Sequence, residues 1–153
     1  GKTVQEFVWE TASESPAPGG GSISALAGSM GCALASMVAN LSSHKRGWDH
    51  QTSYFSDWAE RGQALADRLL YLVDEDTRSF NRIMEAFQLP KTNEKEIAER
   101  KLAISEATIY AMEIPVQVME CCLQGFEICK EMAERGMSSS ASDVGVGNLM
   151  LWA

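Results

Sequence analysis

Basic residues are scarce in this chain. Its 153 residues include 13 Lys and Arg against 21 Asp and Glu, for a formal net charge of −8. Because nucleic-acid backbones and acidic membranes attract positively charged surfaces, this balance argues against broad contact with either. An anionic ligand would therefore need a local basic patch.

Cysteine and histidine patterns typical of metal or disulfide sites are also missing. The four cysteines, at positions 32, 121, 122 and 129, form no Cys-x-x-Cys pair, and the two histidines are not spaced as ligands beside them. The sequence thus indicates neither a zinc site nor a disulfide framework. We expect reduced thiols, a cytoplasmic protein, and no metal or redox cofactor.

Charge is absent altogether from Ser15 to Ser43, a stretch longer than the ~20 residues of a membrane span. Two prolines, three consecutive glycines and several serines in it argue against a span, and no second apolar stretch follows. Its small residues recur at four-residue steps, at positions 27, 31, 35 and 39. Such a face favours close helix packing, within a bundle or across a dimer.

Hairpin signals such as Asn-Gly or Asp-Gly are lacking, and the periodicity is helical throughout, so the expected fold is all-α. We expect one domain, residues 1–153, built as a bundle of long antiparallel helices that forms oligomers and continues beyond Ala153. The first expected helix starts at Thr3 with a Thr3–Glu6 capping box, and the second is capped by Ser22 or Ser24. The third runs from about Ser53 to Leu89 and is stopped by Pro90. The fourth starts after Asn93, is kinked or broken at Pro115 and ends at Gly136, and a last helix starts near Asp143.

Two core faces follow from the periodicity. The expected face of the third helix is Phe55, Trp58, Gly62, Leu65, Leu69, Leu72, Asp76, Phe80, Ile83 and Phe87. The expected face after Asn93 is Ile97, Leu102, Ile104, Ile109, Val116, Met119, Leu123, Phe126 and Ala133.

Asp76 is the anomaly on the first of these faces, between Leu72 and Phe80, whereas Asp74 and Glu75 fall off it. An ionised carboxylate on a core face needs a partner. One reading is a structural acid paired with an arginine from another helix. The other is a carboxylate whose surroundings adapt it to proton transfer.

Three further segments are candidates for ligand contact. The loop from Pro16 to Gly21 leads into a helix start, where free backbone N–H groups favour anions, although most such loops are simply turns. His44–Arg46 is either a helix C-terminal cap or a cationic landing site for a carboxylated ligand. Ser142–Gly147 places Asp143 at a helix start, where an ordinary cap is the simpler reading.

Six motifs occur in order along nearly the whole chain: Ser15-Pro-Ala-Pro-Gly-Gly-Gly-Ser22, Ser36-Met-Val-Ala-Asn-Leu41, Leu72-Val-Asp-Glu-Asp76, Phe80-Asn81, Leu89-Pro-Lys91 and Ser142-Asp-Val-Gly-Val-Gly147. Taken together, they resemble the formiminotransferase-cyclodeaminase C-terminal family. The family normally continues past the position of Trp152, and its members often carry a smaller residue where His44 stands.

The resemblance implies a role for each motif. Asp76 would be the catalytic acid-base residue, and the glycine loop would contribute to a folate site. With the basic cluster, the expected substrate-binding residues are Pro18, Gly19, Gly20, Gly21, Ser22, Asn40, Lys45 and Asp143.

The implied activity is cyclisation of 5-formiminotetrahydrofolate to 5,10-methenyltetrahydrofolate with release of ammonia. A methenyltetrahydrofolate cyclohydrolase on the same fold and a non-catalytic helical assembly module are the alternatives. The implied partners are a folate, with or without a polyglutamate tail, further copies of the chain, and a formiminotransferase that is fused or separate.

Overall fold

The computed structural model describes all residues 1–153 and contains helices only, which confirms the all-α expectation. The elements in chain order are α1 Val4–Thr11, α2 Gly20–Ser43, the short 3₁₀ helix η1 Asp49–Gln51, α3 Thr52–Gln88, α4 Glu94–Arg135, the 3₁₀ helix η2 Ser138–Ser140 and α5 Ala141–Trp152. The predicted capping box is present, because Thr3 caps α1 and Glu6 returns the hydrogen bond.

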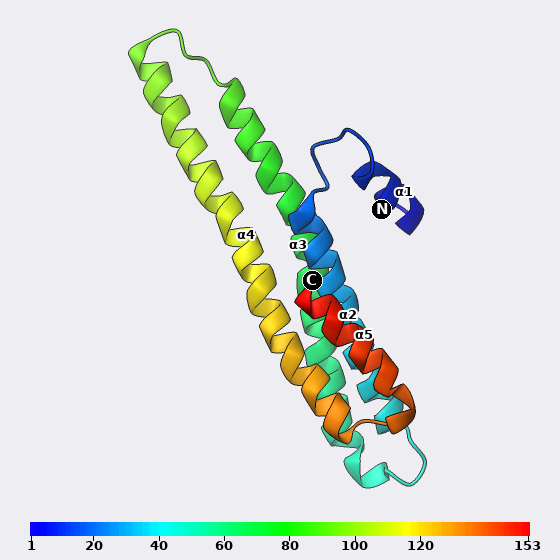
Figure 1. Cartoon of the computed structure of the whole chain (residues 1–153). Coiled ribbons are helices and arrows are strands. Elements are labelled where there is room, and N and C mark those ends of the chain that lie inside the picture. Colours follow the sequence, from blue (N-terminus) through cyan, green and yellow to red (C-terminus); the bar gives the residue numbers. More distant parts are fainter.

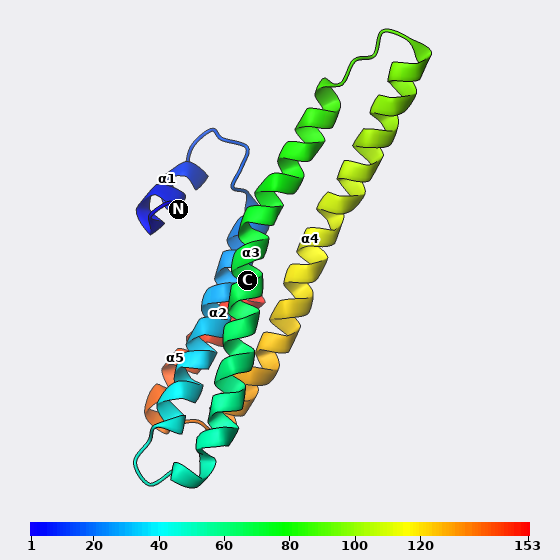
Figure 2. The same ribbon diagram turned by 180° about the vertical axis from the view of Figure 1, so that it is seen from behind.

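Helix α2 lies at the centre of the arrangement and packs against α3, α4 and α5 (Figure 1). Helices α3 and α4 are the longest elements and project together past one end of α2 and α5, while α1 stands beside the bundle (Figure 2). By length and composition α2 could cross a membrane, yet 56% of its most apolar window is buried against the other helices. It therefore has the burial of a central bundle helix.

The small-residue face of α2 packs within the bundle. Ala35 and Ala39 are fully buried, and a Cβ added to Gly31 would lie 2.7 Å from the carbonyl oxygen of Gly147 in α5. The expected close approach of a second helix at this face is confirmed, and the approaching helix is α5.

The predicted start of α2 is wrong. Gly19 is the N-cap and makes no side-chain capping bond, and the helix begins at Gly20. Neither Ser22 nor Ser24 caps it, since Ser22 lies inside the first turn and its hydroxyl donates to a side chain of α3. Likewise Asp143 is not a cap but an acid in the first turn of α5, which follows Ser140.

The predicted core face of α4 is wrong for most of its length. Helix α4 runs unbroken through Pro115 to its C-cap at Gly136. The residues expected inside but exposed are Ile97, Leu102, Ile109, Val116, Met119, Leu123 and Ala133. The buried ones are Ile114, Val118, Cys121, Cys122, Gly125, Ile128, Cys129 and Met132. The helix carries two apolar stripes, and periodicity alone does not say which one meets the core.

The predicted face of α3 is largely confirmed. Phe55, Leu69 and Leu72 are fully buried, whereas Phe87 near the projecting end is exposed. The prediction for Glu75 is wrong, because this residue was expected off the core face but is only 7% exposed.

Candidate active site

Asp76 lies on α3 where that helix passes the start of α2. Its side chain is half-buried, and its Oδ2 accepts a hydrogen bond of 2.8 Å from the hydroxyl of Ser22, which is itself fully buried. The Ser22 Oγ also lies 3.3 Å from the Oγ1 of Thr77. The carboxylate is thus oriented by a neutral donor from another helix.

Gly21 makes this close approach possible. A Cβ at Gly21 would lie 2.7 Å from the Asp76 Cγ and 2.9 Å from its Oδ2, so any side chain there would displace the carboxylate. Gly20, one residue earlier, is exposed and a Cβ on it would meet nothing within 4 Å. Only the second of these glycines is therefore required by the geometry around Asp76.

No Lys, Arg or His nitrogen lies within 4 Å of the Asp76 carboxylate, and all five ion pairs of the chain involve other acids. The reading of Asp76 as half of a buried ion pair is therefore contradicted. A carboxylate held by a hydroxyl and left without a cation is free to exchange a proton with a ligand.

Glu75 faces a different neighbour from Asp76. Its carboxylate accepts hydrogen bonds from the Tyr71 hydroxyl and from the Arg78 guanidinium, the latter at 3.4 Å. The hydrogen bond from Tyr71 is the main reason why the pKa of Glu75 lies below its ordinary value of 4.5, and Arg78 lowers it further. The hydrogen bond between Tyr71 and Glu75 also raises the pKa of Tyr71. Glu75 is thus an ionised acid with its own partners, and Asp74 is exposed.

The start of α2 leaves its backbone donors available. Gly19 caps the helix through its backbone alone, and Pro18 before it is buried. The first N–H groups of a helix have no partner inside the helix, and together with the helix dipole they favour a polar or anionic ligand. This helix start lies at the same end of α2 as Asp76, because Ser22 is bonded to Asp76. The predicted site residues that belong to it are Pro18, Gly19, Gly20, Gly21 and Ser22.

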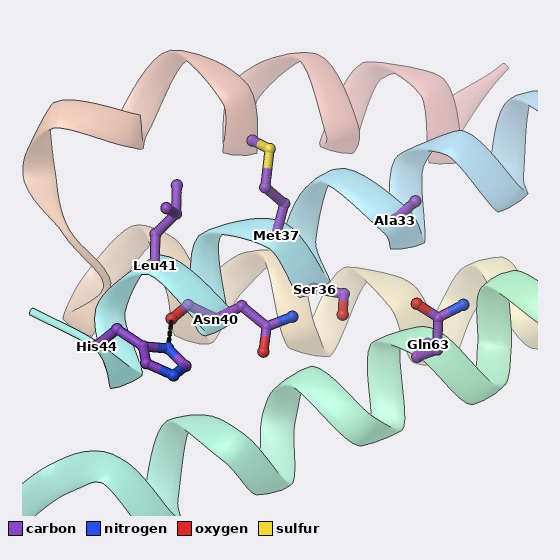
Figure 3. Close-up of a pocket in the computed structure, with 7 residues that line it drawn as sticks. All are labelled: Ala33, Ser36, Met37, Asn40, Leu41, His44 and Gln63. Carbon is purple, nitrogen blue, oxygen red and sulfur yellow. Dashed lines mark hydrogen bonds between the residues drawn. The ribbon is translucent and has the colours of Figure 1, made fainter.

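The remaining predicted site residues lie at the other end of α2. Asn40 lines an open groove of about 400 Å³ with His44, Met37 and Gln63 of α3 (Figure 3). Asn40 lies eighteen positions after Ser22, which corresponds to about 27 Å along the helix. One chain alone does not bring Asn40 to Asp76.

The basic cluster His44–Arg46 lies at this same C-terminal end of α2. The His44 Nδ1 lies 2.8 Å from the Asn40 carbonyl oxygen and His44 is the C-cap of α2, which confirms the capping interpretation for this residue. The Lys45 ammonium lies 3.8 Å from the centre of the Trp48 ring. Asp143 is also nearer this end, since η2 before it follows Met137, whose N–H donates to Ser42.

The cysteines offer no alternative centre. All four thiols are free and buried, and desolvation raises the pKa of Cys32 to about 12 and that of Cys129 to about 11. Protonated thiols in an apolar core are poor nucleophiles. No three His, Cys, Asp or Glu side chains of the chain are arranged to hold a metal ion.

Comparison with known proteins identifies the family. Residues 3–153 match the profile of the formiminotransferase-cyclodeaminase family. The chain belongs to that family. The predicted resemblance is thereby confirmed, and it extends across all the elements that surround Asp76.

Individual relatives agree with this assignment. A methenyltetrahydrofolate cyclohydrolase of Methylorubrum extorquens is 32% identical over 152 residues, which cover 99% of this chain and 73% of that protein. The formimidoyltransferase-cyclodeaminase of Mus musculus is 35% identical over 144 residues, which cover 94% of this chain and 27% of that longer protein. The crystal structure of a formiminotetrahydrofolate cyclodeaminase from Thermotoga maritima superposes with a TM-score of 0.84 at 26% identity, covering 99% of this chain and 71% of that one.

Proposed function

We propose that this family member acts on a tetrahydrofolate derivative and converts 5-formiminotetrahydrofolate to 5,10-methenyltetrahydrofolate with release of ammonia. The observation that carries the proposal is Asp76, a half-buried carboxylate with no cationic partner that is oriented by Ser22 and lies against Gly21. The name of the Thermotoga maritima relative, a formiminotetrahydrofolate cyclodeaminase, supports the choice of substrate, and the name of the mouse relative supports a cyclodeaminase reaction.

The reaction needs one group that first accepts a proton and then donates it. N10 of the folate attacks the carbon of the protonated formimino group, and the Asp76 carboxylate accepts the proton that N10 loses. The resulting carboxylic acid then protonates the amino group on the same carbon, the C–N bond breaks, and ammonia leaves. The methenyl bridge retains the single positive charge, so atoms and charge balance. A carboxyl group positioned beside both nitrogens can perform both transfers.

Methenyltetrahydrofolate cyclohydrolase is the second candidate, and the Methylorubrum extorquens relative is the observation in its favour. In that reaction Asp76 would accept a proton from a water molecule that adds to the methenyl carbon. Both reactions place the folate against the same carboxylate. The non-catalytic assembly module loses its main support, because the arginine partner it required for Asp76 is absent.

The proposed setting follows from the same assignment. We propose a cytoplasmic protein that works as an oligomer, with Gly19–Gly21 and the α2 N-terminus contacting the pterin end of the folate. Residues from the Asn40–Lys45 end would contact the glutamate tail. A formiminotransferase, whether fused or separate, would supply the formimino substrate.

Two assays on the same preparation separate the candidates. Ammonia release from 5-formiminotetrahydrofolate and loss of the methenyl absorbance from 5,10-methenyltetrahydrofolate are measured in parallel. Ammonia release as the faster reaction supports the cyclodeaminase, and methenyl hydrolysis without ammonia release supports the cyclohydrolase. If the whole protein shows neither activity, the proposal is rejected.

A further inference from the structure

The two carboxylate oxygens of Asp76 have different surroundings. Its Oδ2 accepts the 2.8 Å hydrogen bond from the Ser22 hydroxyl, whereas Oδ1 takes part in no hydrogen bond within the chain. Since no buried side-chain oxygen of the chain lacks a hydrogen-bond partner, Oδ1 reaches solvent. A Cβ on Gly21 would overlap Oδ1 more closely than any other atom, so the glycine keeps this oxygen uncovered. The carboxylate therefore has one held oxygen and one open oxygen.

The Ser22 hydroxyl has no access to water. The residue is fully buried, so its hydroxyl forms hydrogen bonds with protein groups alone. Its single hydrogen is directed at Asp76, because an ionised carboxylate only accepts hydrogen bonds. The Ser22 oxygen is then left to accept a hydrogen bond from another group. The hydroxyl of Thr77, whose Oγ1 lies 3.3 Å away, is the group in reach.

The Thr77 hydroxyl is turned away from the backbone of its own helix. A threonine inside a helix can donate to the carbonyl oxygen four residues earlier, as Thr108 does to Ile104 in α4. Thr77 makes no such bond, and the Ser22 Oγ is the one hydrogen-bonding neighbour of its Oγ1. Because the Ser22 hydrogen is already directed at Asp76, the hydrogen between the two hydroxyls comes from Thr77.

The lengths of the two hydrogen bonds agree with this direction. A hydrogen bond to an ionised acceptor is shorter than one between neutral groups, and 2.8 Å at Asp76 against 3.3 Å at Thr77 has that order. Hydroxyl groups that donate in series polarise one another, so the Thr77 bond strengthens the bond from Ser22 to Oδ2. Ser79, another hydroxyl nearby, donates to the backbone carbonyl of Asp76 and not to its carboxylate.

We propose that Thr77 is a positioning residue that acts on Asp76 through Ser22. The two hydroxyls hold Oδ2 and leave Oδ1 as the oxygen that accepts the proton from the folate and returns it to the leaving nitrogen. The hydroxyl hydrogens of Thr77 and Ser22 stay in place during both steps, so one proton moves. Because Oδ2 is fixed, the carboxylate keeps the same orientation between the two transfers. This catalytic role rests on the proposed function, whereas the direction of the hydrogen bonds does not.

Two substitutions at Thr77 and a matched control test the positioning role in the whole protein. Thr77→Val keeps the branched shape and a similar helix propensity but removes the hydroxyl. We expect kcat to fall about three- to tenfold with little change in KM, because one neutral hydrogen bond contributes an effect of that order. Thr77→Ser should restore kcat, and Thr108→Val, which removes a hydroxyl from α4, should leave it unchanged. An unchanged kcat in Thr77→Val, or no recovery in Thr77→Ser, would overturn the proposal.

A double-mutant cycle with Ser22→Ala gives a measurement that does not depend on folate turnover. Urea unfolding is followed for wild type, Ser22→Ala, Thr77→Val and the double variant. If Thr77 donates to Ser22, the effect of Thr77→Val should largely disappear once Ser22 has lost its hydroxyl, and the effect on kcat should disappear with it. Additive effects on unfolding would overturn the proposal whether or not the protein turns over folate. Coupled unfolding in a protein without folate activity would instead reject the proposed function and leave the hydrogen bonds as described.

Discussion

At the scale of single residues, the site depends on Asp76 and on two neighbours, Gly21 and Ser22, that precede it by more than fifty positions in the sequence. Asp76 is oriented by the Ser22 hydroxyl and rests against the backbone of Gly21. Gly20 and Gly21 look equivalent in the sequence, but only Gly21 contacts the Asp76 carboxylate. A substitution at each position therefore tests the geometry.

We expect Gly21→Ala to lower kcat/KM by about 10²-fold, because displacement of a catalytic group by about 1 Å has an effect of that order. Gly20→Ala should retain near wild-type activity, since its Cβ meets no atom within 4 Å. Steady-state kinetics and melting temperatures of both variants make the comparison. Equal loss of activity in the two variants would show that contact with Asp76 is not what the glycine provides.

Glu75 should make folding sensitive to acid. Its pKa is lowered from 4.5 by the Tyr71 hydrogen bond, so the ionised form stabilises the folded state. That contribution is present above pH 4.5 and is lost as the pH falls through the lower folded-state pKa. Chemical unfolding of wild type and Glu75→Gln at pH 7 and below pH 4.5 should show a smaller acid loss in the variant.

Glu60→Gln, an exposed change on the same helix, is the control for that comparison. An acid loss of the same size in wild type and Glu75→Gln would remove Glu75 from the explanation.

At the scale of the helices, close packing of α2 against α5 and α4 depends on small residues. Gly31 faces the carbonyl of Gly147 and the side chain of Leu151, and Gly125 in α4 faces Leu151 and Cys32. These contacts fix α5 on α2.

Gly31→Ala should therefore destabilise the fold by about 1–3 kcal/mol through overpacking. Gly145→Ala, on the open side of α5, should stabilise it by up to about 1 kcal/mol, because alanine is the better helix former and its Cβ meets nothing. Urea unfolding of both variants provides the free energies. Equal stabilisation by both substitutions would contradict close packing at Gly31.

The sequence predicted the helices better than their orientations. Pro90, the Thr3 capping box and the periodicity of α3 were enough to place α1 and α3. The face of α4 was misassigned because the helix is apolar on two sides, and only the packed bundle decides between them. Burial of Glu75 and the role of Ser22 as the partner of Asp76 depend on contacts between side chains, which spacing along one helix does not reveal.

At the scale of the whole molecule, the candidate site residues are divided between the two ends of α2. The basic cluster at Lys45 and Arg46 follows the end remote from Asp76 of the same chain. Under the proposed function, this cluster contacts the glutamate tail of the folate. The substrate tail then provides a test of the division.

Lys45→Glu with Arg46→Glu should raise the KM of a polyglutamylated folate on the order of tenfold, since each exposed ion pair contributes about 0.2–1 kcal/mol. The monoglutamate should be affected much less. Kinetics with both substrates at two salt concentrations measures the difference. An equal effect on both substrates would leave the cluster as a helix cap.

Asp76 is proposed to carry the proton transfer, and one substitution in the whole protein separates that role from a structural one. Asp76→Asn keeps an oxygen to accept the Ser22 hydrogen bond but cannot exchange a proton. We predict that folate turnover falls by roughly 10²-fold or more while the melting temperature stays close to that of wild type. A structural ion pair would instead lose about 3–5 kcal/mol of stability when broken. An Asp76→Asn protein that is destabilised yet still turns over folate at the wild-type rate would contradict the account.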